Sequence, residues 1–226
     1  MIRSRFVPLV ALLAGLTAPA MAQVQRHQYE VSARVGTMNF DQSAAIKNGS
    51  VVGVDGTYYF TSHVGLGWYL DATRAVTDGS FFPAEFTFGD TLFLYEVSQP
   101  ITVLHYGLQA VVTAGYRRIS PYVAVGGGWY RFFLDPQVAN GPKSFTKPMF
   151  ALAGGLNMRL GAATGLRMEV RDAIHTDFDR DRLNPVGSRF QPVRFPHVLG
   201  PTVAEKGTTH NVQLSIAFSF APGRGQ

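Results

Sequence analysis

The sequence has no cysteine, few charged residues and no long apolar run beyond its N-terminal segment. Without cysteine, the chain can form neither structural disulfides nor a lipid-modified N-terminal cysteine. Only 15% of the 226 residues are charged and 46% are hydrophobic, which is too apolar a balance for a disordered chain. Downstream of residue 22, no segment approaches the roughly 18 consecutive apolar residues of a transmembrane helix. Any membrane-spanning part of the chain must therefore consist of strands.

Glycine and aromatic residues, by contrast, are abundant. The chain has 24 glycines, and aromatic residues make up 12% of it. This balance suits strands and turns better than helices, so we expect a single all-β domain. The formal charge is +5, but the arginines are scattered among acidic residues and form no basic run. We therefore expect no nucleic-acid partner.

Residues 1–22 have the features of an export signal. Arg3 and Arg5 form a basic start, residues 6–16 are mainly apolar, and Ala20-Met21-Ala22 is a small-x-small cleavage site. We predict that this signal peptide is removed, which leaves residues 23–226 as one exported domain with strands between about 28 and 220.

The exported part shows a repeated period-2 pattern. Between 64 and 73, apolar side chains at even positions alternate with small or polar ones, and 211–220 repeats the pattern and ends in Phe218 and Phe220. The register of the fifth segment, residues 121–132, is ambiguous, and we place Val123, Val125 and Trp129 on the outer face. The six further segments that we assign as strands are about 28–37, 50–60, 101–115, 121–132, 147–159 and 165–175.

The connections between these eight segments are alternately short and long. Residues 61–62, 116–120 and 160–164 form short turns, whereas the other four connections are much longer. Outer-membrane barrels have short periplasmic turns at one rim and long external loops at the other. We therefore predict an eight-stranded antiparallel up-and-down transmembrane β-barrel. The alternative is a soluble sandwich or lipocalin-like barrel. The strands of such folds also alternate apolar and polar residues, but their connections need not alternate between short and long.

The segments also resemble the small eight-stranded outer-membrane barrels of the OmpA-like and OmpW-like type. The similar stretches are Pro121-Tyr122 with the glycines at 126–128, the strand 165–172 and the closing stretch 213–220. The closing stretch is similar to the assembly signal of such barrels. Two departures are a serine where glycine is usual and six residues after the last aromatic. The signal residues would be Gln213, Ser215, Phe218 and Phe220.

This class implies an outer-membrane location in a diderm bacterium. Its expected partners are the barrel-assembly machinery, outer-membrane lipid and lipopolysaccharide, and we expect no cofactor. No cell-wall tethering role is implied, because we identify no periplasmic peptidoglycan-binding domain after the barrel.

Charged side chains on the inner faces predict a network inside the barrel. Arg167, Glu169 and Arg171 stand at alternate positions of one strand and therefore share one face. An eight-stranded barrel is just wide enough for side chains to fill. We expect a self-paired polar plug, with a gated ion path as the alternative. The other residues expected on inward faces are Glu30, Arg34, Asp55, Asp71, His105 and Gln109.

Enzyme and metal sites find less support. A lipid-processing barrel enzyme would need a Ser, His and acid set. The nearest candidates are Ser188, His175, His197 and His210, but none of them stands in a nucleophile motif. His175 is more simply a residue at the rim. Asp177, Asp179 and Asp181 alternate as in a calcium loop, but arginines interrupt them.

The second long connection is unusually aromatic, with four phenylalanines at 81–88 followed by residues 92–95. Either the neighbouring strands extend beyond the membrane, or this loop folds onto the rim.

These observations predict a non-enzymatic barrel with a structural or surface-interaction role through its external loops. The alternatives are an OmpW-like conduit for small hydrophobic molecules and, with less support, a lipid-modifying barrel enzyme. A conduit would need an apolar inner wall near the outer rim, whereas the inward residues found here are polar. That difference favours the first role.

Overall fold

The computed structural model describes residues 28–88, 90–114, 118–134, 144–161, 163–184, 191–192 and 203–222. The predicted signal peptide at 1–22 lies outside these residues, so its cleavage and the domain boundary at 23 stay predictions. Within the described ranges, no helix is long and apolar enough to cross a membrane.

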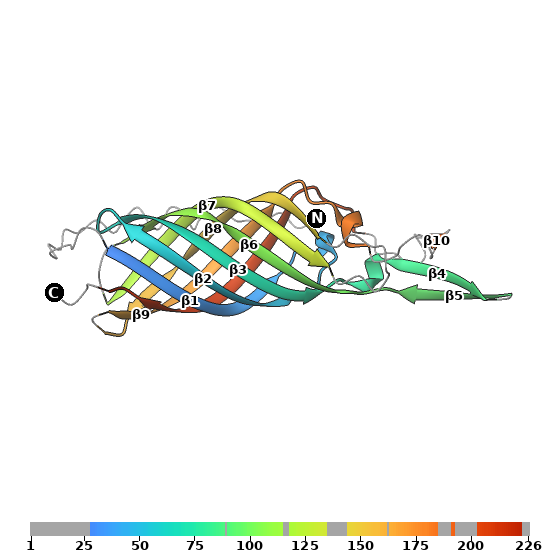
Figure 1. The fold of residues 1–226 in the computed structure, drawn as a ribbon, viewed down its shortest axis with the longest axis horizontal. Coiled ribbons are helices and arrows are strands. Elements are labelled where there is room, and N and C mark those ends of the chain that lie inside the picture. The colour runs from blue at the N-terminus through green and yellow to red at the C-terminus, as the bar shows by residue number, and fades with distance from the viewer. Residues whose placement is uncertain are drawn as a thin grey trace, which may run out of the picture.

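Eight strands among the described residues close into one antiparallel barrel (Figure 1). Every neighbour in the ring is the next barrel strand along the chain, and pairing of the first strand with the last closes it, with Val35 opposite Ile216. The predicted eight-stranded up-and-down barrel is therefore confirmed. Its strands are β1 (Gln28–Asn39), β2 (Gly49–Tyr59), β3 (Val64–Val76), β6 (Pro100–Thr113), β7 (Ile119–Leu134), β8 (Ser144–Arg159), β9 (Thr164–His175) and β11 (Thr209–Phe220).

The period-2 pattern sets the two faces of the barrel wall. On β11, the side chain of Leu214 is 47% exposed, whereas the neighbouring Gln213 is fully buried. The predicted register of the fifth strand is confirmed, because Val123, Val125 and Trp129 point outward and Ala124 is buried. An apolar outer face and a polar inner one suit a wall that stands in hydrocarbon.

Several strands extend further at the loop-rich end than the sequence pattern predicts. β3 continues to Val76, β7 to Leu134, and β8 begins at Ser144. The added residues include outward side chains such as Arg74 and Thr146, which are exposed. Backbone pairing continues there although apolar side chains no longer alternate with polar ones. Pattern reading therefore stopped where the outer face became polar.

The short and long connections lie at opposite ends of the barrel. In Figure 1 the short turns and the C-terminal end of β11 lie at one end, and the long connections lie at the other. By the usual asymmetry of outer-membrane barrels, the long connections mark the external end. The described parts of the external connections contain three short 3₁₀ helices, η2 (Gln42–Ala44), η3 (Gly79–Phe81) and η4 (Arg180–Leu183).

The aromatic connection between β3 and β6 forms a second sheet. Strands β4 (Pro83–Phe88) and β5 (Thr91–Glu96) pair as a hairpin, and β10 (Gln191–Pro192) pairs with β4. This hairpin projects beyond the external end of the barrel (Figure 1). The two sequence alternatives were therefore incomplete. Phe82 does fold onto the rim, where it is 3% exposed, but the residues after it form strands of their own.

Candidate functional site

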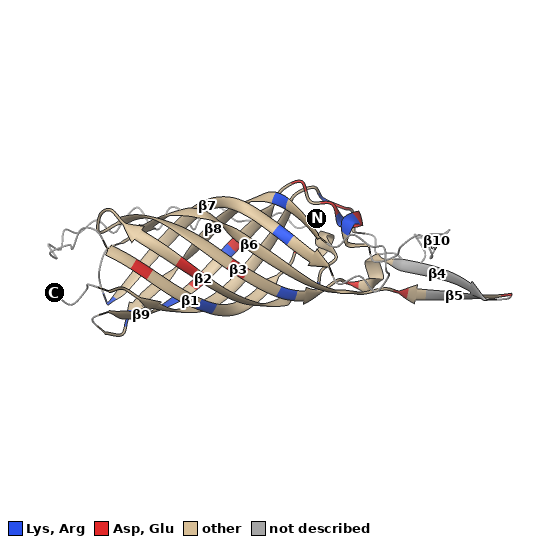
Figure 2. Cartoon of the chain, viewed as in Figure 1, with Lys and Arg blue, Asp and Glu red and all other residues tan. Residues whose placement is uncertain are grey.

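The nine side chains expected in the lumen all lie inside the barrel. None of them is more than 5% exposed. They come from β1, β2, β3, β6 and β9. Figure 2 shows charged residues spread along the barrel wall, with several basic ones close to its external end. Because successive side chains of a strand point to opposite faces, each lies on the inward parity of its strand. The nine are Glu30, Arg34, Asp55, Asp71, His105, Gln109, Arg167, Glu169 and Arg171.

Arg34 on β1 is surrounded by three carboxylates. Its Nη1 donates to Oε1 of Glu169 at 2.8 Å. Its Nη2 lies 3.1 Å from Oδ1 of Asp55, and its Nε lies 3.1 Å from Oδ1 of Asp71. The side chains in these pairs are at most 2% exposed, so water screens the ion pairs little.

Arg167 holds the end of the network nearer the periplasm. Its Nη1 donates to Oδ2 of Asp55 at 2.8 Å, and its Nη2 donates to Oε1 of Glu30 at 2.8 Å. Its Nε donates to the side-chain carbonyl of Asn157 at 3.0 Å. Asp55 therefore bridges Arg167 and Arg34, with Ser32 donating a further short hydrogen bond to its Oδ1.

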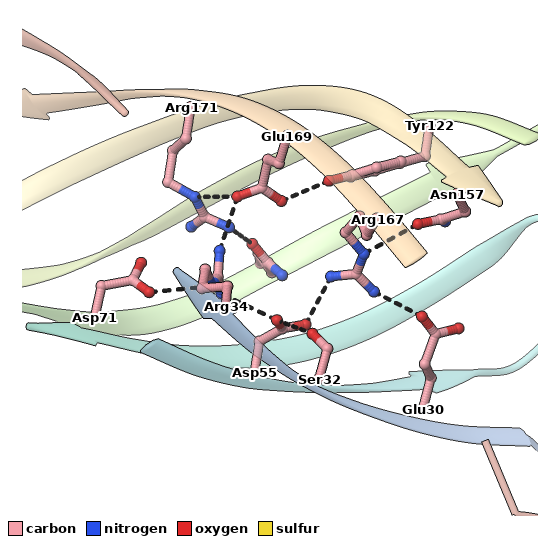
Figure 3. Close-up of polar contacts among 11 residues, drawn as sticks. Glu30, Ser32, Arg34, Asp55, Asp71, Tyr122, Asn157, Arg167, Glu169 and Arg171 are labelled. Carbon is pink, nitrogen blue, oxygen red and sulfur yellow. Dashed lines mark hydrogen bonds and ion pairs between the residues drawn. The ribbon is translucent and has the colours of Figure 1, made fainter. Parts of the chain in front are cut away.

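Glu169 connects this group to Arg171. Oε1 of Glu169 also accepts from Nε of Arg171 at 2.9 Å, and Oε2 accepts from the Tyr122 hydroxyl at 2.6 Å. Nη2 of Arg171 donates to Gln109 at 2.9 Å, and the guanidinium lies 4.5 Å from the centre of the Tyr69 ring. Figure 3 shows the hydrogen bonds and ion pairs as one continuous network across the lumen.

The network joins cations and anions in nearly equal number. Three arginines meet four carboxylates within the ion pairs described above. Charges removed from water are stable only when paired and hydrogen-bonded. Ser32, Tyr122 and Asn157 supply several of these bonds, and the sequence reasoning did not assign them to the network. Their position on the inward face of a strand was the available signal. That position does not show which inward residues join the network.

His105 does not join the arginines as expected. Its Nε2 lies 2.8 Å from Nε2 of His175, and both rings are buried. The sequence reasoning placed His175 simply at the rim, yet the structure stacks its ring on Tyr130 with centroids 4.0 Å apart. At 2.8 Å, one of the two nitrogens donates a hydrogen bond and the other accepts it.

The expectation of a polar inward face is wrong for the external part of the lumen. Apolar side chains from the strands and the loops form one buried cluster there. Phe132 and Phe145 stack with centroids 4.9 Å apart, and Phe178 and Leu183 from the last long connection are also buried in the cluster. The sequence reasoning considered charged positions first and missed this layer, because inward Val, Ile and Phe near strand ends resemble ordinary loop borders.

Several residues of the candidate enzyme and metal sites pair with other side chains among the described residues. Asp179 caps η4 and pairs with Arg182, and Asp177 pairs with Lys147. Within the described part of the chain, no three His, Cys, Asp or Glu residues form a metal-binding group. His210 pairs with Asp172 at 2.7 Å on the outer face of the barrel. Ser188 and His197 lie outside the described residues.

The proposed assembly-signal residues divide between the two faces of β11. Gln213 and Ser215 face the lumen at 0% and 7% exposure, whereas Phe218 and Phe220 face outward at 53% and 46%. The two aromatic rings therefore lie on the outer surface at the periplasmic end of the last strand. Their role in assembly stays a proposal.

A closed barrel with an apolar outer face and a charged inner network defines a transmembrane β-barrel. The chain belongs to the family of the outer membrane protein beta-barrel domain, whose model matches residues 9–220. It is therefore an outer-membrane protein of a Gram-negative bacterium, and the predicted class and location are confirmed.

Several solved structures are similar to the chain at low sequence identity. Neisserial surface protein A is 10% identical with a TM-score of 0.49, over 88% of this chain and 99% of that one. Ail of Yersinia pestis, in complex with the heparin analogue sucrose octasulfate, is 12% identical with a TM-score of 0.46, over 87% and 100%. OprG of Pseudomonas aeruginosa is 12% identical with a TM-score of 0.48, over 87% and 96%. No curated protein matches the chain.

Proposed function

We propose that this protein is a non-enzymatic barrel that holds its external connections in place for contacts at the cell surface. The observation that carries this proposal is the β4–β5 hairpin, which stands beyond the barrel as part of a separate sheet. Phe93 and Tyr95 on β5 are 41% and 50% exposed, and their rings stack with centroids 6.4 Å apart. Exposed aromatic side chains on a projecting hairpin are typical of a contact surface.

The base of the hairpin is anchored to the mouth of the barrel. The backbone N–H of Val97 donates to the carbonyl of Phe82 at 3.2 Å, and the Gln99 side chain donates to the carbonyl of Leu183 at 2.7 Å. Phe82 and Leu183 are both buried in the apolar cluster. A base held in this way reduces the conformational entropy that the hairpin would lose on binding a partner.

The lumen network supports a structural role for the barrel itself. Arg171, Asp71, Tyr69 and Tyr130 are at most 1% exposed, so hardly any of their surface is open to water. We propose that the barrel is closed to steady ion flow and serves as an anchor. In planar bilayers, we expect at most brief, small conductance events. Large steady conductance would contradict the closed lumen.

The surface role is tested by removing the hairpin from the intact barrel. Residues 83–96 are replaced by a short Gly-Ser linker, and Phe93→Ala/Tyr95→Ala serves as a milder variant. Cells producing equal amounts of heat-modifiable barrel are compared for adhesion to cultured epithelial cells and for autoaggregation. We expect both variants to show less adhesion or aggregation than the parent. Unchanged behaviour of both would contradict a surface role for the hairpin.

A conduit for small hydrophobic molecules is the second candidate, because the apolar cluster supplies the inner wall that such a role needs near the outer rim. In cells with an intact lipopolysaccharide layer, uptake of a fluorescent apolar probe would then rise with production of the barrel. Phe132→Ala, which opens the cluster, would raise uptake further. Uptake equal to that of cells lacking the barrel would contradict the conduit.

A further inference from the structure

An apolar groove crosses the outer face of β1, β11, β9 and β8. Its volume is about 780 Å³. Val35, Leu156, Met168 and Leu214 line it, and each of these side chains is 43–62% exposed. The groove therefore belongs to the surface that faces the bilayer, and not to the lumen.

A glycine creates the depression. Gly154 lies between the outward side chains of Leu152 and Leu156 on β8, and it pairs with Val170 on β9. Without a side chain at this position, the outer surface is recessed between the two leucine side chains. A Cβ at position 154 would meet only the Tyr122 carbonyl oxygen, at 3.6 Å, so the sheet does not need glycine there for close packing.

A polar pair stands on the same face, towards the external end. Nδ1 of His210 on β11 lies 2.7 Å from Oδ2 of Asp172 on β9. Asp172 is two residues beyond Val170, and His210 is four residues before Leu214, which correspond to about 7 Å and about 14 Å along the strands. The outward positions of β11 from Val212 to Phe220 are apolar, so His210 lies where the apolar band ends.

We propose that the groove binds one acyl chain of a lipopolysaccharide molecule, with the polar group at the head of that chain hydrogen-bonded to His210. The groove is continuous with the lipid-facing surface of an outer-membrane barrel. Its polar end lies on the external side, which stands in the leaflet that contains lipopolysaccharide. This proposal is independent of the surface role of the hairpin.

The chemistry of the polar pair suits the head of an acyl chain. Asp172 occupies Nδ1 of His210 and fixes the orientation of the ring, which leaves Nε2 for a ligand. The His210 side chain is 58% exposed. Ester carbonyls, amides and hydroxyls occur where lipopolysaccharide acyl chains meet the sugar headgroup, and each can form one hydrogen bond with an imidazole nitrogen.

The test measures lipid binding to the mature barrel in mild detergent by native mass spectrometry, with rough-type lipopolysaccharide as the probe. Gly154→Leu fills the groove. Gly127→Leu is the matched control, because Gly127 is also an outward glycine of the wall, on β7, and a Cβ there would meet its nearest atoms at 3.7 and 3.8 Å. His210→Leu removes the polar end. Heat-modifiable migration verifies that each variant is folded.

We expect the parent and Gly127→Leu to bind one lipopolysaccharide with the same affinity. Gly154→Leu and His210→Leu should each bind it about tenfold or more weakly. Equal binding by Gly154→Leu would overturn the groove as the site. Equal affinity of the parent for phosphatidylethanolamine would overturn the assignment to lipopolysaccharide. A dimer of the parent that Gly154→Leu abolishes would show that a second copy of the chain occupies the groove instead.

Discussion

Arg34 and Glu169 are separated by 135 positions in the sequence, yet their side chains meet at 2.8 Å in the middle of the barrel. Strand β1, which carries Arg34, is separated from β9 in the ring only by β11. The contact therefore depends on closure of the barrel between its first and last strands. Because Glu169 also binds Arg171 and Tyr122, this one carboxylate links β9 to both β1 and β7 across the lumen.

Removal of Glu169 should destabilise the barrel strongly. Glu169→Ala leaves the Arg34 and Arg171 guanidinium groups without a shared anion, and breaking a buried pair typically costs about 3–5 kcal/mol. Urea unfolding in lipid vesicles can be followed by the fluorescence of the lipid-facing Trp68 and Trp129, which are 46% and 53% exposed. Lys206→Ala, which breaks an exposed pair with Asp41, is the control and should cost less than about 1 kcal/mol. An equal loss of unfolding free energy in both variants would indicate that water reaches the network.

The cost of a charge on the outer face should depend on its depth. Leu70 and Val76 both lie on the outer face of β3, but Leu70 is near the middle of the strand and Val76 is at its external end. We expect Leu70→Arg to cost about 2–4 kcal/mol and Val76→Arg about 0–1 kcal/mol. Arg74 already occupies the outer face between them. The same unfolding assay measures both variants. A larger cost for Val76→Arg than for Leu70→Arg would mean that the middle of β3 does not lie at the middle of the bilayer.

The last aromatic residue should matter for assembly. Phe220→Ala removes an outward ring at the end of β11, and we expect a smaller inserted fraction by heat-modifiable migration. Ala221 is buried, and its N–H donates to the carbonyl of Ala163 at 2.8 Å. Truncation after Ala221 should therefore be tolerated better than truncation after Phe220. Normal insertion of Phe220→Ala would argue against the assembly signal.

The last long connection should be tied to the barrel through Asp177. The Lys147 ammonium donates to this carboxyl and lowers its pKa below the ordinary value of 3.8. Titration by NMR should show this lowered pKa, and Lys147→Ala should return it towards the ordinary value. A lowered pKa in the folded state stabilises the fold above the ordinary pKa, and this contribution disappears as the pH falls through the lowered value. An unchanged titration in Lys147→Ala would mean that the pair does not form in solution.

Local sequence pattern was sufficient to place the lumen residues. Side chains of a strand alternate between its faces regardless of its neighbours, so the inward position of Arg167, Glu169 and Arg171 followed from their spacing. The outward apolar set of β11 followed in the same way. Alternation of short and long connections then specified the up-and-down order, because each short turn joins two adjacent antiparallel strands.

The contacts among the inward residues could not be predicted in this way. Pairing of Arg34 with Glu169, and of His105 with His175, depends on barrel closure and on the stagger between strands, and neither is encoded in the period of any one segment. The same holds for the β4–β5 hairpin and for the apolar layer that Phe178 completes from a distant loop. The face that each strand residue occupies is a local property of the backbone, so it can be worked out from one segment alone. The partners of those residues depend on contacts between segments far apart in the chain, which exist only once the barrel has closed.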